Sequence, residues 1–259
     1  MISRKRIWFI LCVLLFYPIS LTACQQKDDS WQKITERGVL YVGLDPTYPP
    51  FEVADESGIY GLDVDLANAI AAEHGLETNF VLFGYDGLYD ALATEQVDVL
   101  ISALVIIPEK TKDFAYSEAY FNAGEYLILP QTENDIQEMA NLNGRILAVE
   151  LGALGHVEAT QWAKRVPNLT IQPYPTPDEA LTAVLQGNAD AVLIDAISGR
   201  LFIKENPQLK IMEPPITVEP FAIVTRIEDE QMQKEINTTL EKLQKSGKLN
   251  TIFEKWLAP

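Results

Sequence analysis

The sequence predicts an α/β protein with two lobes, and three observations lead to this fold class. Apolar runs typical of strands alternate with amphipathic runs typical of helices, which indicates parallel βαβ units. The alternation begins near residue 38 and begins again near residue 125, which favours two separate lobes. The strand candidates are nearly continuous apolar runs, as expected where helices cover both faces of a sheet.

The first lobe is predicted from residues 39–102. Residues 61–75 form a helix in which Asp63 is placed to cap the first turn and Gly75 to end the last. Asp65 also falls in that first turn, where the helix dipole favours an acid. The other expected elements are strands at 39–43, 79–83 and 97–102 and a helix at 87–96.

The second lobe repeats the pattern between residues 125 and 206. Each apolar run is short enough for a strand, and each amphipathic run is long enough for a helix. The expected strands cover 125–130, 145–149, 169–174 and 190–195, and the expected helices cover 133–144, 155–166, 176–188 and 196–206.

The final segment, residues 229–257, predicts a long amphipathic helix that packs back on the first lobe. The chain then crosses between the lobes twice, near residues 126–130 and 216–224, which predicts a two-stranded hinge. Hinged α/β lobes bind ligands in the cleft at the carboxyl ends of their strands. We expect lobe 1 to comprise residues 35–126 and 222–259, and lobe 2 to comprise residues 127–221.

Residues 1–23 predict a secretory signal peptide, with a basic start, a short apolar core and small residues before Cys24. Pro18 interrupts the apolar core, which is shorter than the ~20 residues of a membrane-spanning helix. Residues 24–34 are expected to form a tether. Removing the signal peptide leaves 17 basic and 37 acidic residues, a formal charge of −20, which argues against nucleic-acid binding.

The mature chain offers little for metal or redox chemistry. Cys12 lies in the signal peptide and Cys24 at its end, so neither a disulfide nor a thiolate metal site is expected. His74 and His156 lack a ligand-like partner at i+3 or i+4. We therefore predict no metal site and no cofactor.

Six motifs, in a fixed order, resemble the polar amino-acid-binding proteins of bacterial ABC importers. They are "GLDPTYPPFE", "GLDVDLANAIA", "PEK" followed by "YS", "VELGALG", "DAVLID" and "GKLNTIFEKW", and they span essentially the whole mature chain. The resemblance implies two Rossmann-like α/β lobes of the type II periplasmic-binding fold. It also implies a monomeric, extracytoplasmic solute-binding protein that carries no enzymatic activity and delivers its ligand to a transmembrane permease.

The sequence "LTAC", residues 21–24, resembles the lipobox of bacterial lipoproteins. This resemblance implies cleavage before Cys24 and attachment of acyl chains to its thiol. Two or three acyl chains hold a protein stably at a membrane surface, whereas one chain binds marginally. We therefore expect a membrane partner through a lipid anchor.

In lobe 1, Asp45 and Tyr48 follow the first strand, and the two prolines after Tyr48 restrict the backbone. The resemblance implies that Tyr48 and Tyr85 stack on the ligand from opposite sides, although each could instead be a core ring. Phe51 is expected in the core. Asp86, beside Tyr85, either makes this end of the pocket acidic together with Asp45 or is an ordinary surface charge.

The next motif departs from the resembled family, in which an arginine and hydroxyl side chains hold the ligand's α-carboxylate. Lys110 stands at the position of the arginine, and a lysine cannot reproduce the bidentate fork of a guanidinium. Val105 and Ala153 stand where the family places hydroxyl groups. Ala103 is expected to line the same part of the site. The carboxylate clamp is therefore weakened.

In lobe 2, Asp195 matches the family's acid for the ligand's α-ammonium group. An acid that ends an apolar strand is costly without a partner, which favours a place in the cleft. Glu150 falls where relatives contact the ligand side chain, or else it is surface charge.

We therefore expect a protein that captures an amino acid or an amino-acid-like, cationic small molecule, while glutamate and aspartate are disfavoured by repulsion. One alternative is a sensory protein that reports its ligand to a receptor. Another is a cyclohexadienyl-dehydratase-like enzyme on the same fold, with Glu150 as its acid.

Overall fold

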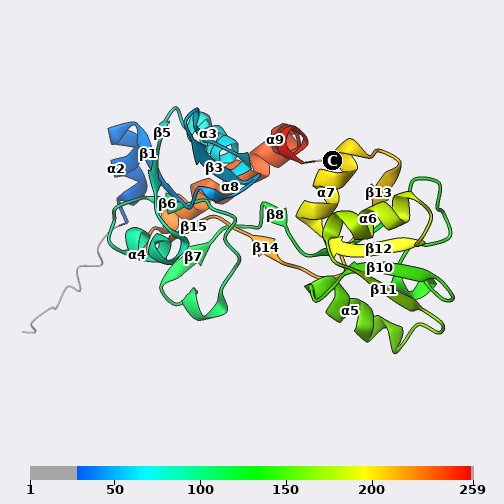
Figure 1. Ribbon diagram of the computed structural model, residues 1–259. Coiled ribbons are helices and arrows are strands. Elements are labelled where there is room, and N and C mark those ends of the chain that lie inside the picture. Colours follow the sequence, from blue (N-terminus) through cyan, green and yellow to red (C-terminus); the bar gives the residue numbers. More distant parts are fainter. Residues whose placement is uncertain (1–27, 258–259) are drawn as a thin grey trace, which may run out of the picture.

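The computed structural model describes residues 28–257 and shows two α/β lobes joined by two short strands (Figure 1). The predicted signal peptide and Cys24 lie outside the described residues. The two-lobed α/β architecture predicted from the sequence is confirmed.

Lobe 1 is built around a mixed sheet with the strand order β5-β1-β6-β15-β7. Strand β1 is parallel to β5 and β6, while β15 returns antiparallel between β6 and β7. The bounds are β1 Val39–Leu44, β5 Glu77–Leu82, β6 Val99–Leu100, β7 Phe114–Tyr116 and β15 Val224–Arg226.

Helices cover both faces of this sheet. One face packs against the buried sides of α2 (Ser30–Arg37), α3 (Leu62–Glu73), α8 (Glu230–Lys245) and α9 (Lys248–Trp256). The other face packs against α4 (Leu88–Ala93), which follows the 3-10 turn η1 (Tyr85–Gly87). A small antiparallel sheet of β2 (Thr47–Tyr48), β3 (Glu52–Asp55) and β4 (Gly58–Tyr60) connects β1 to α3.

Lobe 2 has a five-stranded sheet with the order β11-β10-β12-β9-β13. Helix α5 covers one face, and α6 and α7 cover the other. The bounds are β9 Glu125–Pro130, β10 Ile146–Glu150, β11 Thr170–Tyr174, β12 Ala191–Asp195, β13 Leu209–Ile211, α5 Leu154–Ala163, α6 Pro177–Leu185 and α7 Ala196–Glu205.

The lobes are joined by β8 (Phe121–Asn122) and β14 (Pro220–Phe221), which pair antiparallel with each other (Figure 1). The chain therefore first crosses between the lobes at β8, earlier in the sequence than the crossing expected at residues 126–130. Those residues lie in β9, which is hydrogen-bonded between β12 and β13 in the sheet of lobe 2. The apolar run predicted as a strand is buried in that sheet and does not cross between the lobes.

Two local predictions were wrong. The expected tether overlaps α2, because Ile34 is buried in lobe 1 and the Trp31 ring packs edge-on against His74 at 4.7 Å. The helix expected at 133–144 is only a 3-10 turn, η3 (Met139–Asn141). There the Glu133 and Asn141 side chains accept hydrogen bonds from nearby backbone N–H groups and so compete with helical pairing.

The C-terminal helical segment packs on lobe 1, as expected. Met232, Ile236, Leu240 and Leu243 of α8 are all buried against the lobe 1 core. Gly247, with φ +77°, separates α8 from α9, because a left-handed residue ends the first helix.

Candidate functional site

The segment after β1 places an exposed ring above a buried one. The Tyr48 side chain is 44% exposed and stacks on Phe51, with ring centroids 5.8 Å apart and planes 19° apart. Phe51 is fully buried and contacts Phe121 at 5.2 Å and Phe221 at 5.4 Å, one from each hinge strand. Phe51 is thus the core residue that was predicted, and it anchors Tyr48 to the hinge.

A chain of hydrogen bonds fixes the loop that carries Asp45. The Asp45 N–H donates to Ser102 Oγ over 2.9 Å, and the Ser102 hydroxyl donates to Glu52 Oε1 over 2.8 Å. Glu52 is buried, and burial together with the nearby Asp63 charge raises its pKa to about 10. Its carboxyl group is therefore protonated at neutral pH.

Asp63 is buried inside lobe 1, and the prediction that it caps α3 was wrong. Gly61 occupies the N-cap position, and Asp63 Oδ2 accepts hydrogen bonds from the Ala103 N–H (2.7 Å) and the Tyr120 hydroxyl (3.0 Å). Burial raises the Asp63 pKa to about 7, although these donors and Glu52 lower it in part. Asp63 therefore ties the loop of Ala103 to the residue just before β8.

The carboxyl groups of Glu52 and Asp63 interact directly. Glu52 Oε2 and Asp63 Oδ1 are both buried and lack a donor among the described residues. A hydrogen bond between the two side chains raises the pKa of Glu52 and lowers that of Asp63. A proton on Glu52 that is donated to Asp63 satisfies both orphaned oxygens.

The other lobe 1 candidates differ in exposure. Ala103 is half-buried with φ +45°, a left-handed conformation that is unusual for an alanine. Val105 is half-buried and forms a single β-bridge with Phe221 of the hinge. Tyr85 is 50% exposed at the start of η1, and Asp86 beside it is exposed.

Lys110 lies in the 3-10 turn η2 (Pro108–Lys110), with its Nζ 4.2 Å from the centroid of the Tyr89 ring. Tyr89 is buried, and its hydroxyl is hydrogen-bonded to that of Tyr116. The lysine therefore rests on a fixed aromatic face in this structure.

The lobe 2 candidates gather at one edge of its sheet. Glu150 and Asp195 are the last residues of the parallel strands β10 and β12, so both lie at the carboxyl edge. Asp195 also caps α7, since its Oδ1 accepts from the N–H groups of Ile197 (3.0 Å) and Ser198 (2.9 Å). Ala153 is the N-cap residue of α5, and its methyl group cannot accept a hydrogen bond from the first turn of the helix.

Acidic residues near the hinge act electrostatically on Tyr48 of lobe 1. The pKa of Tyr48 is raised first by burial and then by the negative charges of Asp195, Glu219 and Glu52. Asp195 and Glu219 lie in or next to lobe 2, so their fields reach Tyr48 across the hinge.

Sequence reasoning missed one acid at this edge. Glu125 begins β9 directly opposite Asp195 in the antiparallel register and is 5% exposed. Burial, together with the charges of Asp195, Glu219 and Glu150, raises its pKa to about 7, although the Gly155 N–H lowers it in part. The available signal was an acid that opens the otherwise apolar run "EYLILP".

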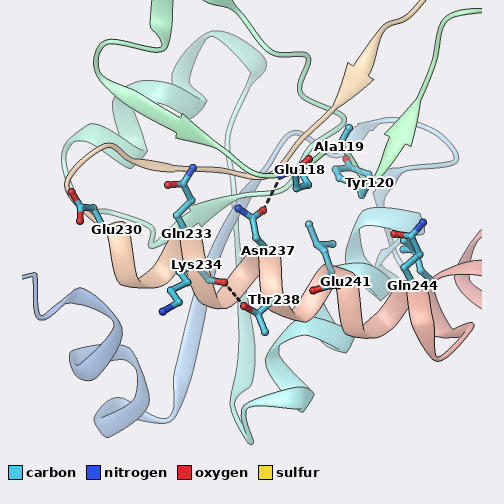
Figure 2. Close-up of a pocket in the computed structure, with 12 residues that line it drawn as sticks. Glu118, Ala119, Tyr120, Glu230, Gln233, Lys234, Asn237, Thr238, Glu241 and Gln244 are labelled. Atoms are coloured by element: carbon cyan, nitrogen blue, oxygen red, sulfur yellow. Dashed lines mark hydrogen bonds between the residues drawn. The ribbon is translucent and has the colours of Figure 1, made fainter.

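Two hollows lie away from these residues. One, of about 620 Å³, runs along α8 on lobe 1 and is lined mainly by polar side chains, with Asn237 Oδ1 accepting from the Glu118 N–H (Figure 2). Another, of about 300 Å³, lies beside the hinge between Tyr126 and Phe253. None of the predicted ligand-binding residues lines either hollow.

Comparison with known proteins identifies the family of the chain. A family model for bacterial extracellular solute-binding proteins, family 3, matches residues 40–259. The chain belongs to this family. Its named relatives are amino-acid-binding proteins, including components of ABC transporters, and the resemblance seen in the motifs is confirmed.

Individual family 3 relatives match over nearly their full length. The L-cystine-binding protein TcyJ of Escherichia coli K12 is 27% identical, over 98% of this chain and 96% of TcyJ. A solved ancestral cationic amino acid solute-binding protein is 30% identical, over 87% and 98% of the two chains, with a TM-score of 0.63. Another structure describes that ancestral protein as a precursor of cyclohexadienyl dehydratase.

The open, unliganded L-cystine solute receptor of Neisseria gonorrhoeae has a TM-score of 0.76 at 24% identity, over 87% of this chain and 95% of the receptor. This likeness supports the fold alone, which is the type II periplasmic-binding fold predicted. Within residues 28–257, no helix combines the length and apolar character needed to cross a membrane.

Proposed function

We propose that this family 3 protein is an extracytoplasmic lipoprotein that captures a cationic amino acid or a similar small molecule between its lobes. The ligand is then delivered to the permease of an ABC importer. Closure of the lobes around the ligand requires that the ligand bind the closed form more tightly than the open form.

One observation supports the proposal that the ligand is cationic. The negative charges of Asp195 and Glu219 act on Tyr48 of lobe 1, and Asp195 and Glu150 end neighbouring strands at one edge of the lobe 2 sheet. A cation placed there gains carboxylate partners from one lobe and the face of an exposed ring from the other. Stacking on an aromatic ring adds roughly 0.5–2 kcal/mol for a cation.

The weak carboxylate clamp supports the same proposal. Val105 and Ala153 offer no side-chain donor, and Lys110 lies over Tyr89. A ligand carboxylate is then held by backbone N–H groups at the start of α5, where the helix dipole favours an anion. Lys110 contributes only when its side chain leaves the Tyr89 ring. The positive end of the ligand therefore contributes more to recognition than its negative end.

The anchor and partner follow from the sequence and the family. We propose that acyl chains on Cys24 hold the protein at the outer surface of a membrane, and that it acts there as a monomer next to its permease. The ~5.5 kcal/mol that moves a two-state equilibrium from 1:99 to 99:1 sets the scale of the affinity difference needed for full closure.

A second candidate is an enzyme of the dehydratase type. The buried Glu125, with a pKa of about 7, has the proton affinity of a general acid at neutral pH. However, the neighbouring carboxylates repel the carboxylates of a prephenate-like substrate. Incubation with prephenate or arogenate tests this function, and formation of an aromatic product would support it over simple binding.

A thermal-shift screen of the purified protein tests the binding function. The panel contains amino acids, diamines, guanidino compounds and dipeptides. A ligand at a hundredfold excess over its Kd stabilises the native state by about 2.7 kcal/mol. We expect arginine, lysine or a related cation to raise the melting temperature. A panel in which no amino acid and no amine does so contradicts the proposed function.

A further inference from the structure

Glu125 is a buried carboxyl group that the fold does not need. Its side chain is 5% exposed, and its Oε2 has no hydrogen-bond partner among the described residues. A buried carboxyl group without a partner is destabilising.

The register places Glu125 in the candidate ligand site. Because β9 is antiparallel to β12, the start of β9 lies at the same sheet edge as the end of β12, and Glu125 is directly opposite Asp195. Glu150 ends the next strand, β10, so three adjacent strands each bring one acid to this edge. Like charges directly opposite each other in a sheet are destabilising.

The Glu125 side chain is directed toward the start of α5. A Cβ added to Gly155 would lie 2.6 Å from Glu125 Oε2, so the glycine leaves room for the carboxyl group. The Gly155 N–H lies close enough to lower the Glu125 pKa, but its geometry makes no hydrogen bond to Oε2. The orphaned oxygen therefore lies at the same helix N-terminus and sheet edge as the candidate residues Ala153 and Asp195.

We propose that Glu125 is a specificity-determining residue that binds a second positive charge of the ligand, while Asp195 binds the first. The ligand is then a basic amino acid or a diamine. This inference rests on the proposed binding function. It explains why the acids are gathered at this edge, since two positive groups of the ligand balance the negative charges there. Within residues 28–257, no group of His, Cys, Asp and Glu side chains is arranged to hold a metal ion instead.

Binding of a dication is then linked to a proton. The groups that act on Glu125 are the carboxylates of Asp195, Glu150 and Glu219 and the N–H of Gly155; of these, Asp195 lies directly opposite in the sheet and Gly155 lies against the Glu125 carboxyl group. With a pKa of about 7, Glu125 is about one tenth ionised at pH 6 and about nine tenths ionised at pH 8. The ligand favours the ionised form, so its affinity rises about tenfold over this range, with release of a proton.

Calorimetric titration of the wild type and Glu125→Gln, with L-arginine and the neutral isostere L-citrulline, tests the proposal. We expect the wild type to prefer arginine and to bind it more tightly at pH 8 than at pH 6. Glu125→Gln is expected to lose both the preference and the pH dependence while still binding citrulline. Glu179→Gln removes an equal charge from an exposed position on α6 and is expected to behave as wild type.

Each other outcome is also decisive. Equal binding of arginine and citrulline by the wild type, or exclusive binding of an amino acid with a neutral side chain, overturns the role of Glu125 but keeps the binding function. Failure to bind any amino acid or amine overturns both. If Glu125→Gln does not fold, titration of the wild type in two buffers of different ionisation enthalpy counts the released proton. Absence of proton release near pH 7 then refutes the proposal.

Discussion

Replacement of Glu52 by glutamine is expected to change how the stability of the protein depends on pH. The pKa of Glu52 is raised to about 10 by burial and by Asp63, so the folded protein holds a proton that the unfolded chain releases near pH 4.5. The stabilisation from this proton is complete below pH 4.5 and is lost as the pH rises toward 10. In that window, the free energy of unfolding falls by roughly 1.4 kcal/mol per pH unit.

Glu52→Gln removes this titration but keeps the contacts. The glutamine oxygen still accepts from Ser102, and its amide group still donates to Asp63. Between pH 6 and pH 8, the wild type is expected to lose roughly 2–3 kcal/mol relative to the variant. Urea unfolding of both proteins at pH 5, 6, 7 and 8 measures the difference. Parallel stability curves, or a wild type that gains on the variant as pH rises, would refute the protonated Glu52.

Three further predictions concern single side chains. Asp195→Asn keeps a good cap for α7, so it is expected to abolish amino-acid binding in a calorimetric titration with little change in melting temperature. Lys110→Ala is expected to weaken binding less. Equal or reversed losses of affinity in the two variants contradict the weakened carboxylate clamp. Tyr48→Ala is expected to lower affinity with little loss of stability, whereas the buried Phe51→Ala costs about 3–5 kcal/mol by urea unfolding; similar costs for both would contradict their different burial. Gly61→Ala is expected to destabilise the protein in the same assay, because its Cβ would lie 2.0 Å from the Phe51 carbonyl oxygen at φ +145°; wild-type stability would contradict this contact.

The periodicity of the sequence was sufficient to predict most of the fold. Alternating apolar and amphipathic runs depend on local spacing, so the parallel strands of both lobes were placed within a few residues, and the C-terminal helical segment was predicted as one helix where the structure has α8 and α9. The position of the hinge depends on which strands pair. The run that begins at Glu125 is equally apolar whether it crosses between lobes or lies within a sheet, so its place could not be read from spacing.

The candidate site was predictable only in part. Motif resemblance pointed to Asp195 and Tyr48, and the negative charge of Asp195 in lobe 2 helps to raise the pKa of Tyr48 in lobe 1. The roles of Asp63 and Glu125 depend on long-range packing, because each acid is buried by segments distant in sequence. An acid near a helix start suggests a cap by propensity alone, and tertiary contacts with Ala103 and Tyr120 override that preference.

The most direct test of a ligand held between the lobes is small-angle X-ray scattering with and without the compound that raises the melting temperature most. The account predicts that ligand lowers the radius of gyration, as the lobes close about β8 and β14, and that Asp195→Asn shows no such change under the same conditions. A ligand that stabilises the protein in the melt but leaves the radius of gyration unchanged would contradict binding between the lobes.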